Sequence, residues 1–177
     1  MPRSSNPSVV IFMGSDSDWS AMGKASQVLD EFGVPHLAIV SSAHRTHDRT
    51  VRLAKNFTRR GTRVFIAGAG AAAHLAGALA AVTPRPVIGV PLASSPLSGL
   101  DSLLSTAQMP SGVPVACTAI GEAGARNAAI LAVQILALSD RRLEARLLAY
   151  RSSLEREVVR KDAKLQKERR AKSPAAP

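Results

Sequence analysis

Residues 9–18 have the sequence Val9-Val10-Ile11-Phe12-Met13-Gly14-Ser15-Asp16-Ser17-Asp18. Five apolar residues in a row that end at a glycine are typical of a strand buried on both faces of a sheet. The residues after Asp18 predict a helix, because their apolar members recur at helical spacing: Met22, Ala25, Leu29 and Phe32. Asp18 can cap the start of this helix, and Gly33 stands where it should end. The stretch therefore predicts a strand, a turn and a helix.

The same alternation of strand and helix continues along most of the chain. Further strands are predicted at about 37–41, 63–67, 86–90 and 113–119, and helices at 46–60, within 68–81, at 100–106 and at 123–138. Strands separated by single helices form parallel sheets with right-handed crossovers, so helices should cover both faces. We therefore predict an α/β fold, namely a three-layer α/β/α sandwich with a parallel sheet of about five strands.

A charged helical extension is predicted after this domain, over residues 141–170. Its apolar residues form a stripe at helical spacing: Leu143, Leu147, Tyr150, Leu154 and Val158. A stripe of this length suits packing on another subunit better than exposure to solvent. We expect one α/β domain over residues 1–140, the helix over 141–170, and a disordered tail over 171–177.

Composition and charge exclude several classes of protein. No stretch reaches the roughly 18 apolar residues that a membrane span needs. Cys117 is the only cysteine, so neither a disulfide framework nor a cysteine-based metal site is expected. Most of the formal net charge of +10 lies in residues 141–172, without the interleaved aromatic residues of a nucleic-acid reader. We expect a cytoplasmic protein with neither a membrane nor a nucleic acid as its partner.

The strand ends select the candidate site before any motif is considered. In open parallel sheets, ligands bind outside the carboxyl ends of the strands, where the strand order reverses. Four segments follow predicted strands: residues 14–18, 41–45, 68–74 and 91–98. They should converge on one rim.

The first of these segments is Gly14-Ser15-Asp16-Ser17-Asp18. Hydroxyls and free amides at a helix N-terminus favour an anion, whereas a carboxylate suits the paired hydroxyls of a ribose. A phosphorylated sugar satisfies both preferences. An ordinary capped loop is the alternative interpretation.

The second segment is Ser42-Ala43-His44-Arg45. Arginine can bind a phosphate or carboxylate through two parallel hydrogen bonds, and histidine is the side chain that titrates near neutral pH. Their juxtaposition suits proton transfer beside a bound anion. A surface histidine and arginine before a helix would give the same tetrapeptide.

The third segment, Gly68-Ala69-Gly70-Ala71-Ala72-Ala73-His74, only superficially matches a dinucleotide fingerprint. The next strand is not followed by the acidic residue that would bind a ribose, so we reject a dinucleotide site. His74 taken alone suits packing or capping better than catalysis. A zinc site formed by His44, His47 and His74 is also disfavoured, because such short loops rarely close that geometry.

Taken together and in order, these motifs resemble the aminoimidazole ribonucleotide carboxylase family over about residues 8–150. Trp19 and Thr46 extend the first two segments in the family pattern, and Leu75 extends the third. The other matching motifs are Pro86-Val87-Ile88-Gly89-Val90-Pro91, Ser98-Gly99-Leu100-Asp101-Ser102-Leu103-Leu104-Ser105, Gln108-Met109-Pro110 and Gly112-Val113-Pro114-Val115.

The resemblance implies a flavodoxin-like fold and a homo-octamer with active sites at subunit junctions. It implies an isomerase of the mutase type in de novo purine biosynthesis, without metal or organic cofactor. Its substrate would be a small nucleotide, 5-(carboxyamino)imidazole ribonucleotide, whose carboxylate moves from the exocyclic nitrogen to ring carbon 4. An ATP-dependent synthetase of that nucleotide would be its functional partner.

The resemblance also implies roles for individual residues. His44 would be the catalytic proton shuttle. Ser15, Asp18 and Arg45 would hold the ribose phosphate, and Ala43, Gly70 and Leu75 would line a pocket that retains carbon dioxide. Ser42 and His74 complete the expected substrate-binding set.

Three residues depart from the family pattern. Ala71 replaces a glycine, and Ala76 and His47 each replace a proline. If position 71 needs a positive φ, the methyl group of Ala71 costs roughly 1 kcal/mol or more. Two alternatives therefore stay open: an oligomer that has lost the reaction and serves as a scaffold or ligand-binding protein, or an enzyme that carboxylates aminoimidazole ribonucleotide directly with free carbon dioxide.

Overall fold

The computed structural model describes residues 6–172. The chain divides into two compact units, Met1–Leu136 and Ala137–Pro177. The first contains the sheet and the helices that cover it, and the second contains the helix α6 (Arg141–Lys172). Helix α6 runs two residues beyond its expected end. Residues 173–177, where we expect a disordered tail, lie outside the described residues.

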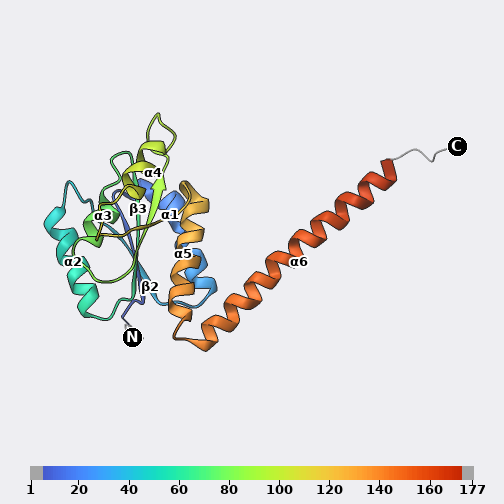
Figure 1. Ribbon diagram of the computed structural model, residues 1–177, viewed down its shortest axis with the longest axis horizontal. Coiled ribbons are helices and arrows are strands. Elements are labelled where there is room, and N and C mark those ends of the chain that lie inside the picture. Colours follow the sequence, from blue (N-terminus) through green and yellow to red (C-terminus); the bar gives the residue numbers. More distant parts are fainter. Residues whose placement is uncertain (1–5, 173–177) are drawn as a thin grey trace. The chain divides into compact units, whose positions relative to one another are not determined.

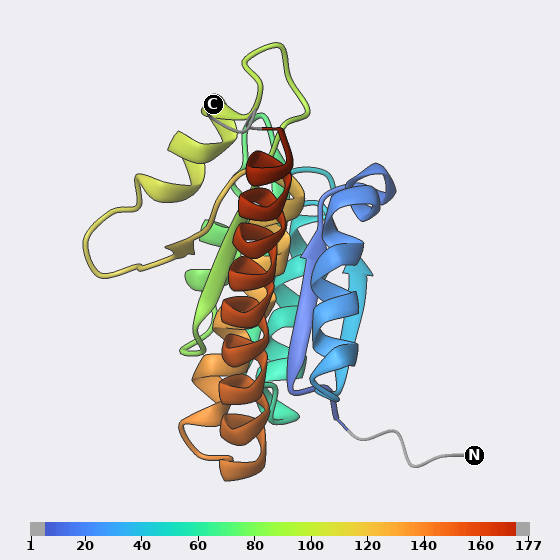
Figure 2. The ribbon, with the colours of Figure 1, turned by 90° about the vertical axis from the view of Figure 1, so that its right-hand side faces the viewer.

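The sheet is parallel and five-stranded, as predicted. Its strands are β1 (Val9–Met13), β2 (His36–Val40), β3 (Val64–Gly70), β4 (Val87–Leu92) and β5 (Ala116–Cys117), in the order β2-β1-β3-β4-β5. This order is the flavodoxin-like one, with its reversal beside β1. Met13, the last residue of β1, pairs with Val40 of β2 and with Gly68 of β3. Three strand ends therefore meet at one rim, and Figure 2 shows the strands running toward the same end of the sheet.

Helices cover both faces of this sheet, which confirms the three-layer prediction. Helices α2 (His47–Arg59) and α3 (Leu75–Ala80) lie on one side, and α5 (Gly121–Ala137) lies on the other (Figure 1). An ion pair of 4.0 Å between Lys24 and Glu122 links α1 (Trp19–Glu31) to α5. Helix α4 (Leu100–Ala107) packs beside β4.

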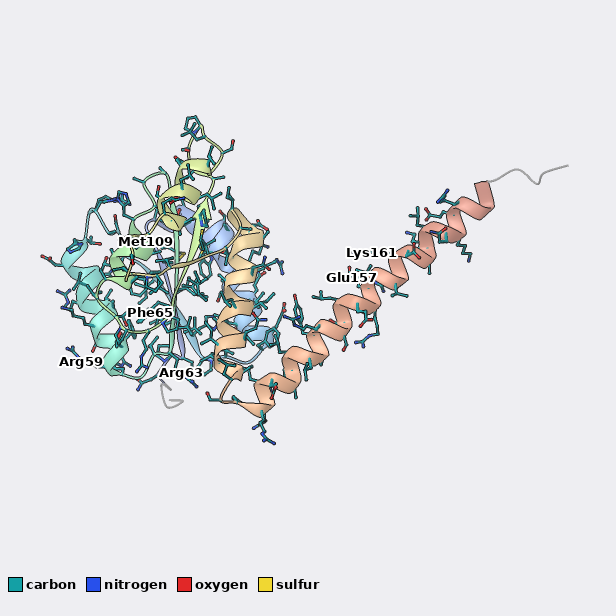
Figure 3. All side chains as sticks on the ribbon, in the orientation of Figure 1. Arg59, Arg63, Phe65, Met109, Glu157 and Lys161 are labelled. Carbon is teal, nitrogen blue, oxygen red and sulfur yellow. The ribbon has the colours of Figure 1, made fainter. Side chains whose placement is uncertain are left out.

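Successive side chains of each strand point to opposite faces of the sheet, so each strand contributes to the apolar core on both faces. On the α2–α3 face, Phe12 and Phe65 are fully buried with ring centroids 6.0 Å apart. Phe65 lies inside the domain, whereas Arg59 lies at the outer end of α2 (Figure 3). On the opposite face, Met22 of α1 packs over Gly68, where a Cβ would overlap its thioether. Burial on both faces explains why β1 is a continuous apolar run.

Three strands differ in length from the prediction. Strand β3 continues through Gly70 instead of ending near Ala67, because residues 68–70 pair with residues 90–92 of a β4 that is also longer than expected. Strand β5 contains only two residues instead of about seven. Pro114 has no amide to donate to a ladder, and this edge strand pairs with β4 only at Ala116 and Cys117.

Helix α6 exposes several large apolar side chains. Leu154 is 44% exposed and Val158 66% exposed, and Leu148, Val159 and Leu165 are exposed as well. Its charged residues pair along the helix, as Glu157 and Lys161 do at 2.6 Å. Packing of this helix on another subunit stays a prediction. Among residues 6–172, none of the helices is long and apolar enough to cross a membrane.

Ala71, which stands where the family pattern has glycine, adopts a left-handed backbone conformation. Its φ is +49°, and it lies in the turn directly after β3. An L-residue pays for this conformation because its Cβ approaches the following carbonyl oxygen. The turn is kept by hydrogen bonds, since the carbonyl of Ala71 accepts from the amide of Ala73 at 2.9 Å and from the hydroxyl of Ser105 at 3.4 Å.

We expect Ala71→Gly to raise the free energy of unfolding by about 1 kcal/mol, because glycine relieves the left-handed strain. The matched control is Ala81→Gly, since Ala81 has a φ of −67° and should lose about 0.5 to 1 kcal/mol. Urea denaturation of both variants measures the difference. Equal changes at the two positions would contradict the strain.

Candidate active site at the carboxyl ends of the strands

A pocket of about 340 Å³ lies where the strand ends meet. Its lining comes from all four predicted segments: Gly14, Ser15, Ser17, Asp18, Ser42, Ala43, His44, Arg45, Ala69, Gly70, Ala72, Leu75 and Ser94. Eight of the nine site residues expected from the sequence are in this set. The ninth, His74, is hydrogen-bonded to His44. The structure therefore brings the predicted residues together.

The turn after β1 is built by a reciprocal cap in which Ser15, not Asp18, plays the capping part. A short 3-10 turn, η1 (Asp16–Asp18), precedes α1. The Ser15 hydroxyl accepts from the Ser17 amide at 3.3 Å, and the Asp18 carboxylate accepts from the Ser15 amide at 3.0 Å. Asp18 stands at the N-cap position directly before Trp19, the first residue of α1, but it does not cap the helix with its side chain. The extra turn moves the cap three residues upstream and holds the Asp18 carboxylate at the pocket.

Partial burial raises the pKa of Asp18 above its ordinary value of 3.8. The amides of Ser15 and Gly14 and the charge of Arg45 act in the opposite direction but more weakly, and Asp16 adds to the rise. A folded-state pKa above the unfolded one means that folding favours the protonated carboxyl. The stability it contributes is present at low pH and is lost as pH rises through the raised pKa. At neutral pH the ionised Asp18 therefore costs stability.

We expect Asp18→Asn to be more stable than the wild-type protein at pH 7, because the amide keeps an acceptor for Ser15 and removes the half-buried charge. The difference should shrink as pH falls toward 3, where Asp18 is protonated in the folded and unfolded states alike. Urea unfolding between pH 3 and 7 measures it. A less stable variant at pH 7 would show that the contacts of the carboxylate outweigh its burial.

A network of hydroxyls fixes the loop after β2. The hydroxyls of Ser41 and Thr50 are 2.8 Å apart in the interior, and Thr50 also donates to the carbonyl of Thr46 at 3.1 Å. Thr46 occupies the N-cap position of α2 but does not cap the helix with its side chain. Its hydroxyl donates to the carbonyl of Ser42 at 3.0 Å and accepts from the Ser42 amide at 3.0 Å. This exchange closes the loop that carries His44 and Arg45.

The two side chains on this loop have defined partners. Arg45 donates from Nη2 to the carbonyl of Gly14 at 2.9 Å, which ties the β2 loop to the β1 loop. Nε2 of His44 lies 2.8 Å from Nδ1 of His74, with the rings nearly perpendicular at 80°. His74 stands directly before α3 without capping it. One imidazole of this pair must supply the proton and the other the lone pair.

The end of β3 forms the narrow side of the pocket. A Cβ on Gly70 would overlap the side chain of Ser94, so only glycine fits between β3 and the loop after β4. Five lining residues are not in the site set expected from the sequence: Gly14, Ser17, Ala69, Ala72 and Ser94. Ser94 belongs to the fourth predicted segment, and its serine-rich composition was the available signal.

The three residues that depart from the family pattern are not among those that line the pocket. Ala71 is exposed in the turn after β3, and Ala76 is buried in the core under α3. His47 lies on the outer face of α2 with Asp48, Val51 and Arg52. His47 is thus separate from His44 and His74, and no group of three or more potential metal ligands occurs within residues 6–172. None of the three departures therefore places a different side chain in the lining of the pocket.

Comparisons with known proteins agree with this geometry. Residues 8–157 match the family described as AIR carboxylase. The chain is 53% identical over 161 residues to the N5-carboxyaminoimidazole ribonucleotide mutase of Mycobacterium leprae (strain TN), covering 91% of this chain and 93% of the relative. It is 54% identical over 145 residues to the mutase of the same name from Haemophilus influenzae, covering 82% and 88%. A solved structure, Treponema denticola PurE, superposes with a TM-score of 0.81 at 29% identity, covering 89% of this chain and 97% of that one.

Proposed function

The chain belongs to the AIR carboxylase family, and from this premise we propose that it is an isomerase of de novo purine biosynthesis. It converts 5-(carboxyamino)imidazole ribonucleotide into 5-amino-1-(5-phosphoribosyl)imidazole-4-carboxylate. Relatives of about 50% identity over most of their length carry the name of this mutase. The observation that carries the proposal is the pocket, which combines polar groups for a phosphorylated sugar with one histidine beside small apolar residues.

The polar half of the pocket suits the ribose phosphate. Asp18 presents a carboxylate that can accept from the two ribose hydroxyls, and Ser15 and Ser42 supply hydroxyls beside it. Arg45 is a permanent cation at the same rim. The apolar half, with Ala43, Gly70 and Leu75, suits the imidazole ring and a molecule of carbon dioxide.

His44 carries the proton through the reaction. As imidazolium it protonates the exocyclic nitrogen of the substrate, whose bond to the carboxylate breaks to give carbon dioxide and the aminoimidazole. Ring carbon 4 then attacks the carbon dioxide. Neutral His44 removes the proton from carbon 4, which restores the aromatic ring and the imidazolium. His44 gives one proton to the nitrogen and takes one back from carbon 4, so the isomerisation needs neither a second acid nor a cofactor.

His74 is a positioning residue for His44. If its Nδ1 accepts the hydrogen bond from Nε2 of His44, Nδ1 of His44 is left for the substrate in both protonation states. His74 would thus play the part of the group that orients the histidine in a catalytic triad, with an imidazole in place of a carboxylate.

A mutase must keep the released carbon dioxide in the pocket until ring carbon 4 attacks it. If the carbon dioxide escaped first, the ring would have to be carboxylated by carbon dioxide from solvent. Carbon dioxide held against the ring benefits from proximity, which intramolecular reactions show to be worth several orders of magnitude. Because Gly70 has no side chain, Ser94 can occupy the space where its Cβ would lie, and the wall of the pocket is closely packed there. The substrate carbamate itself has to be supplied by an ATP-dependent synthetase. We place this phosphorylated, membrane-impermeant nucleotide and its enzyme in the cytoplasm.

We expect His44→Asn to lower kcat by ~100- to ~10,000-fold, the usual contribution of a general acid–base group. The assay follows the carbon-carboxylated product from synthetic carboxyaminoimidazole ribonucleotide without ATP, metal or bicarbonate. His47→Asn is the matched control, since His47 lies outside the pocket, and it should keep wild-type kcat. An inactive but folded wild-type protein would refute the mutase. A His44→Asn variant within tenfold of wild type would refute the shuttle.

We further propose that the chain assembles as an octamer in which α6 packs on a neighbouring subunit. The exposed apolar residues of α6 support this, because isolated helices in solvent rarely present such a stripe. Leu154 and Val158 are four residues apart and lie on one face.

We expect the double variant Leu154→Glu/Val158→Glu to lose the octamer, because the two added carboxylates cannot be buried in an apolar contact. Light scattering should give a mass near eight times 18.6 kDa for the wild-type protein and a smaller mass for the variant. Ser152→Glu, on the opposite face of α6, is the control that should stay octameric. A wild-type monomer would contradict the assembly.

A further inference from the structure

The second half of helix α6 is strongly basic, and nothing in the proposed reaction uses it. The match to the AIR carboxylase family ends at residue 157, near the middle of α6, whereas the helix continues without interruption to Lys172. Residues 158–172 contain seven lysine or arginine residues and two acidic residues, a net charge of +5. The arrangement of these charges on the helix indicates which kind of partner they suit.

Four basic residues share one face of this part of the helix. Residues three or four positions apart lie next to each other on the same side of an α-helix. No acidic residue interrupts the row that they form, and all four side chains are exposed. This row, the basic ridge, consists of Arg156, Arg160, Lys164 and Lys167, at intervals of four, four and three residues.

Most of the charge on the basic ridge is not neutralised. Lys164 lies 3.9 Å from Glu168, an exposed pair of the kind that contributes little. Among the side chains that the structure describes, no carboxylate lies within 4.0 Å of the other three cations of the ridge. Glu157 is paired instead with Lys161, at 2.6 Å (Figure 3). The ridge therefore keeps at least three positive charges for a partner.

The basic ridge and the apolar stripe of α6 lie on different faces of the helix. The stripe continues through Leu154, Val158 and Leu165, which are all exposed. At 3.6 residues per turn, these apolar residues lie roughly 120° to 160° around the helix from Arg160. Packing of α6 through its stripe on a neighbouring subunit therefore leaves the ridge facing away from the contact.

An anionic membrane does not fit this arrangement. A helix that lies on a bilayer buries its apolar face and keeps its cations near the border of that face, where the headgroups are. Here the cations and the apolar side chains point apart. A helix inserted through Val158 and Leu165 would hold the ridge away from the headgroups.

An acidic protein surface fits the basic ridge poorly as well. Protein interfaces have a buried centre of aromatic and apolar side chains inside a polar rim. The ridge contains only long cationic side chains, so it lacks such a centre. Its partner has to be held by charge alone.

A chain of phosphates matches the basic ridge in length and in chemistry. At a rise of 1.5 Å per residue, the ridge from Arg156 to Lys167 spans roughly 16 Å, and one strand of duplex DNA presents about five phosphates over this length. Guanidinium groups bind phosphate oxygens through two parallel hydrogen bonds, and lysines add point charges. The lack of aromatic residues, which made a nucleic acid unexpected from the sequence, excludes stacking on bases but not contact with phosphates.

We propose that the basic ridge of α6 binds the phosphate backbone of a nucleic acid, without preference for base sequence. The proposal does not depend on the reaction, because the ridge and the pocket at the strand ends share no residue. Binding through the ridge attaches the protein to a nucleic acid and neither needs nor changes turnover.

The variant that tests this proposal is Arg156→Gln/Arg160→Gln/Lys167→Gln. It removes the three ridge charges that have no carboxylate partner among the described side chains. Glutamine forms helices about as well as arginine and lysine, so α6 should be kept. The apolar stripe is unchanged, so light scattering should give the wild-type mass.

The matched control is Arg52→Gln/Lys55→Gln/Arg59→Gln. These three residues are exposed on the outer face of α2 and lie outside the pocket at the strand ends. The control removes two arginines and one lysine, as the ridge variant does, so the two variants have the same net charge. Only the place from which the charge is removed differs.

The measurement is fluorescence anisotropy of short labelled oligonucleotides, single-stranded and duplex and of several sequences, with the intact protein. At roughly 50 mM salt, we expect the ridge variant to bind about tenfold or more weakly than the wild-type protein, and the control to stay within about twofold. For the duplex, the slope of log K against log salt should fall by about 2 to 3 in the ridge variant, roughly 0.9 for each lost phosphate contact.

Equal losses of affinity in the two variants would show that net charge alone attracts the nucleic acid, and would overturn the proposal. Unchanged affinity in the ridge variant, or a more than about tenfold difference between sequences of equal length, would overturn it as well. A smaller mass of the ridge variant in light scattering would place the ridge in a subunit contact instead. Vesicles that contain phosphatidylserine provide the last comparison: binding to them without binding to any oligonucleotide would assign α6 to a membrane.

Discussion

The pairing of β1 with a parallel strand on each side is the constraint on which the rest of the structure depends. Because Met13 pairs with both Val40 and Gly68, the chain leaves β1, β2 and β3 at one rim and within reach of each other. Helices must return on both faces to connect parallel strands, and they diverge where the strand order reverses. The crevice between them is the pocket. Its residues are far apart in sequence and are gathered only by this backbone pairing.

Several residues in and beside the pocket lower the stability of the fold. The carboxylate of Asp18 is half-buried, which raises its pKa, and Ala71 occupies a left-handed turn that favours glycine. Gly70 cannot carry a side chain because Ser94 fills that space. The hydroxyl network of Ser41, Thr46 and Thr50 offsets part of this cost by satisfying the loop that presents His44 and Arg45. Strain and buried charge at a rigid frame are typical of sites that bind and transform a ligand.

Much of this arrangement could be predicted from the sequence, because apolar runs mark buried strands and parallel strands place their ends together. Strands β1 to β4 and the three layers follow from such patterns, whereas the family and its flavodoxin-like fold were predicted from the resemblance of several ordered motifs. The features that could not be predicted depend on contacts that override the local sequence preference. Gly68-Ala69-Gly70 has the composition of a loop, yet pairing with β4 keeps it in the sheet. Ser15 takes the capping role expected of Asp18, because a 3-10 turn precedes α1. The contact of His44 with His74, thirty residues away, depends on side-chain directions that sequence spacing does not encode.

The central claim is that the carboxylate leaves the nitrogen and returns to carbon 4 without leaving the pocket. It is tested most directly with substrate labelled with carbon-13 in the carbamate, turned over in a large excess of unlabelled bicarbonate and carbon dioxide. The account predicts that nearly all of the label appears in the carboxylate on carbon 4, because the proposed mechanism keeps the carbon dioxide in the pocket lined by His44, Ala43, Gly70 and Leu75. Product that carries the unlabelled carbon of the medium would contradict it and would assign the protein to direct carboxylation with free carbon dioxide.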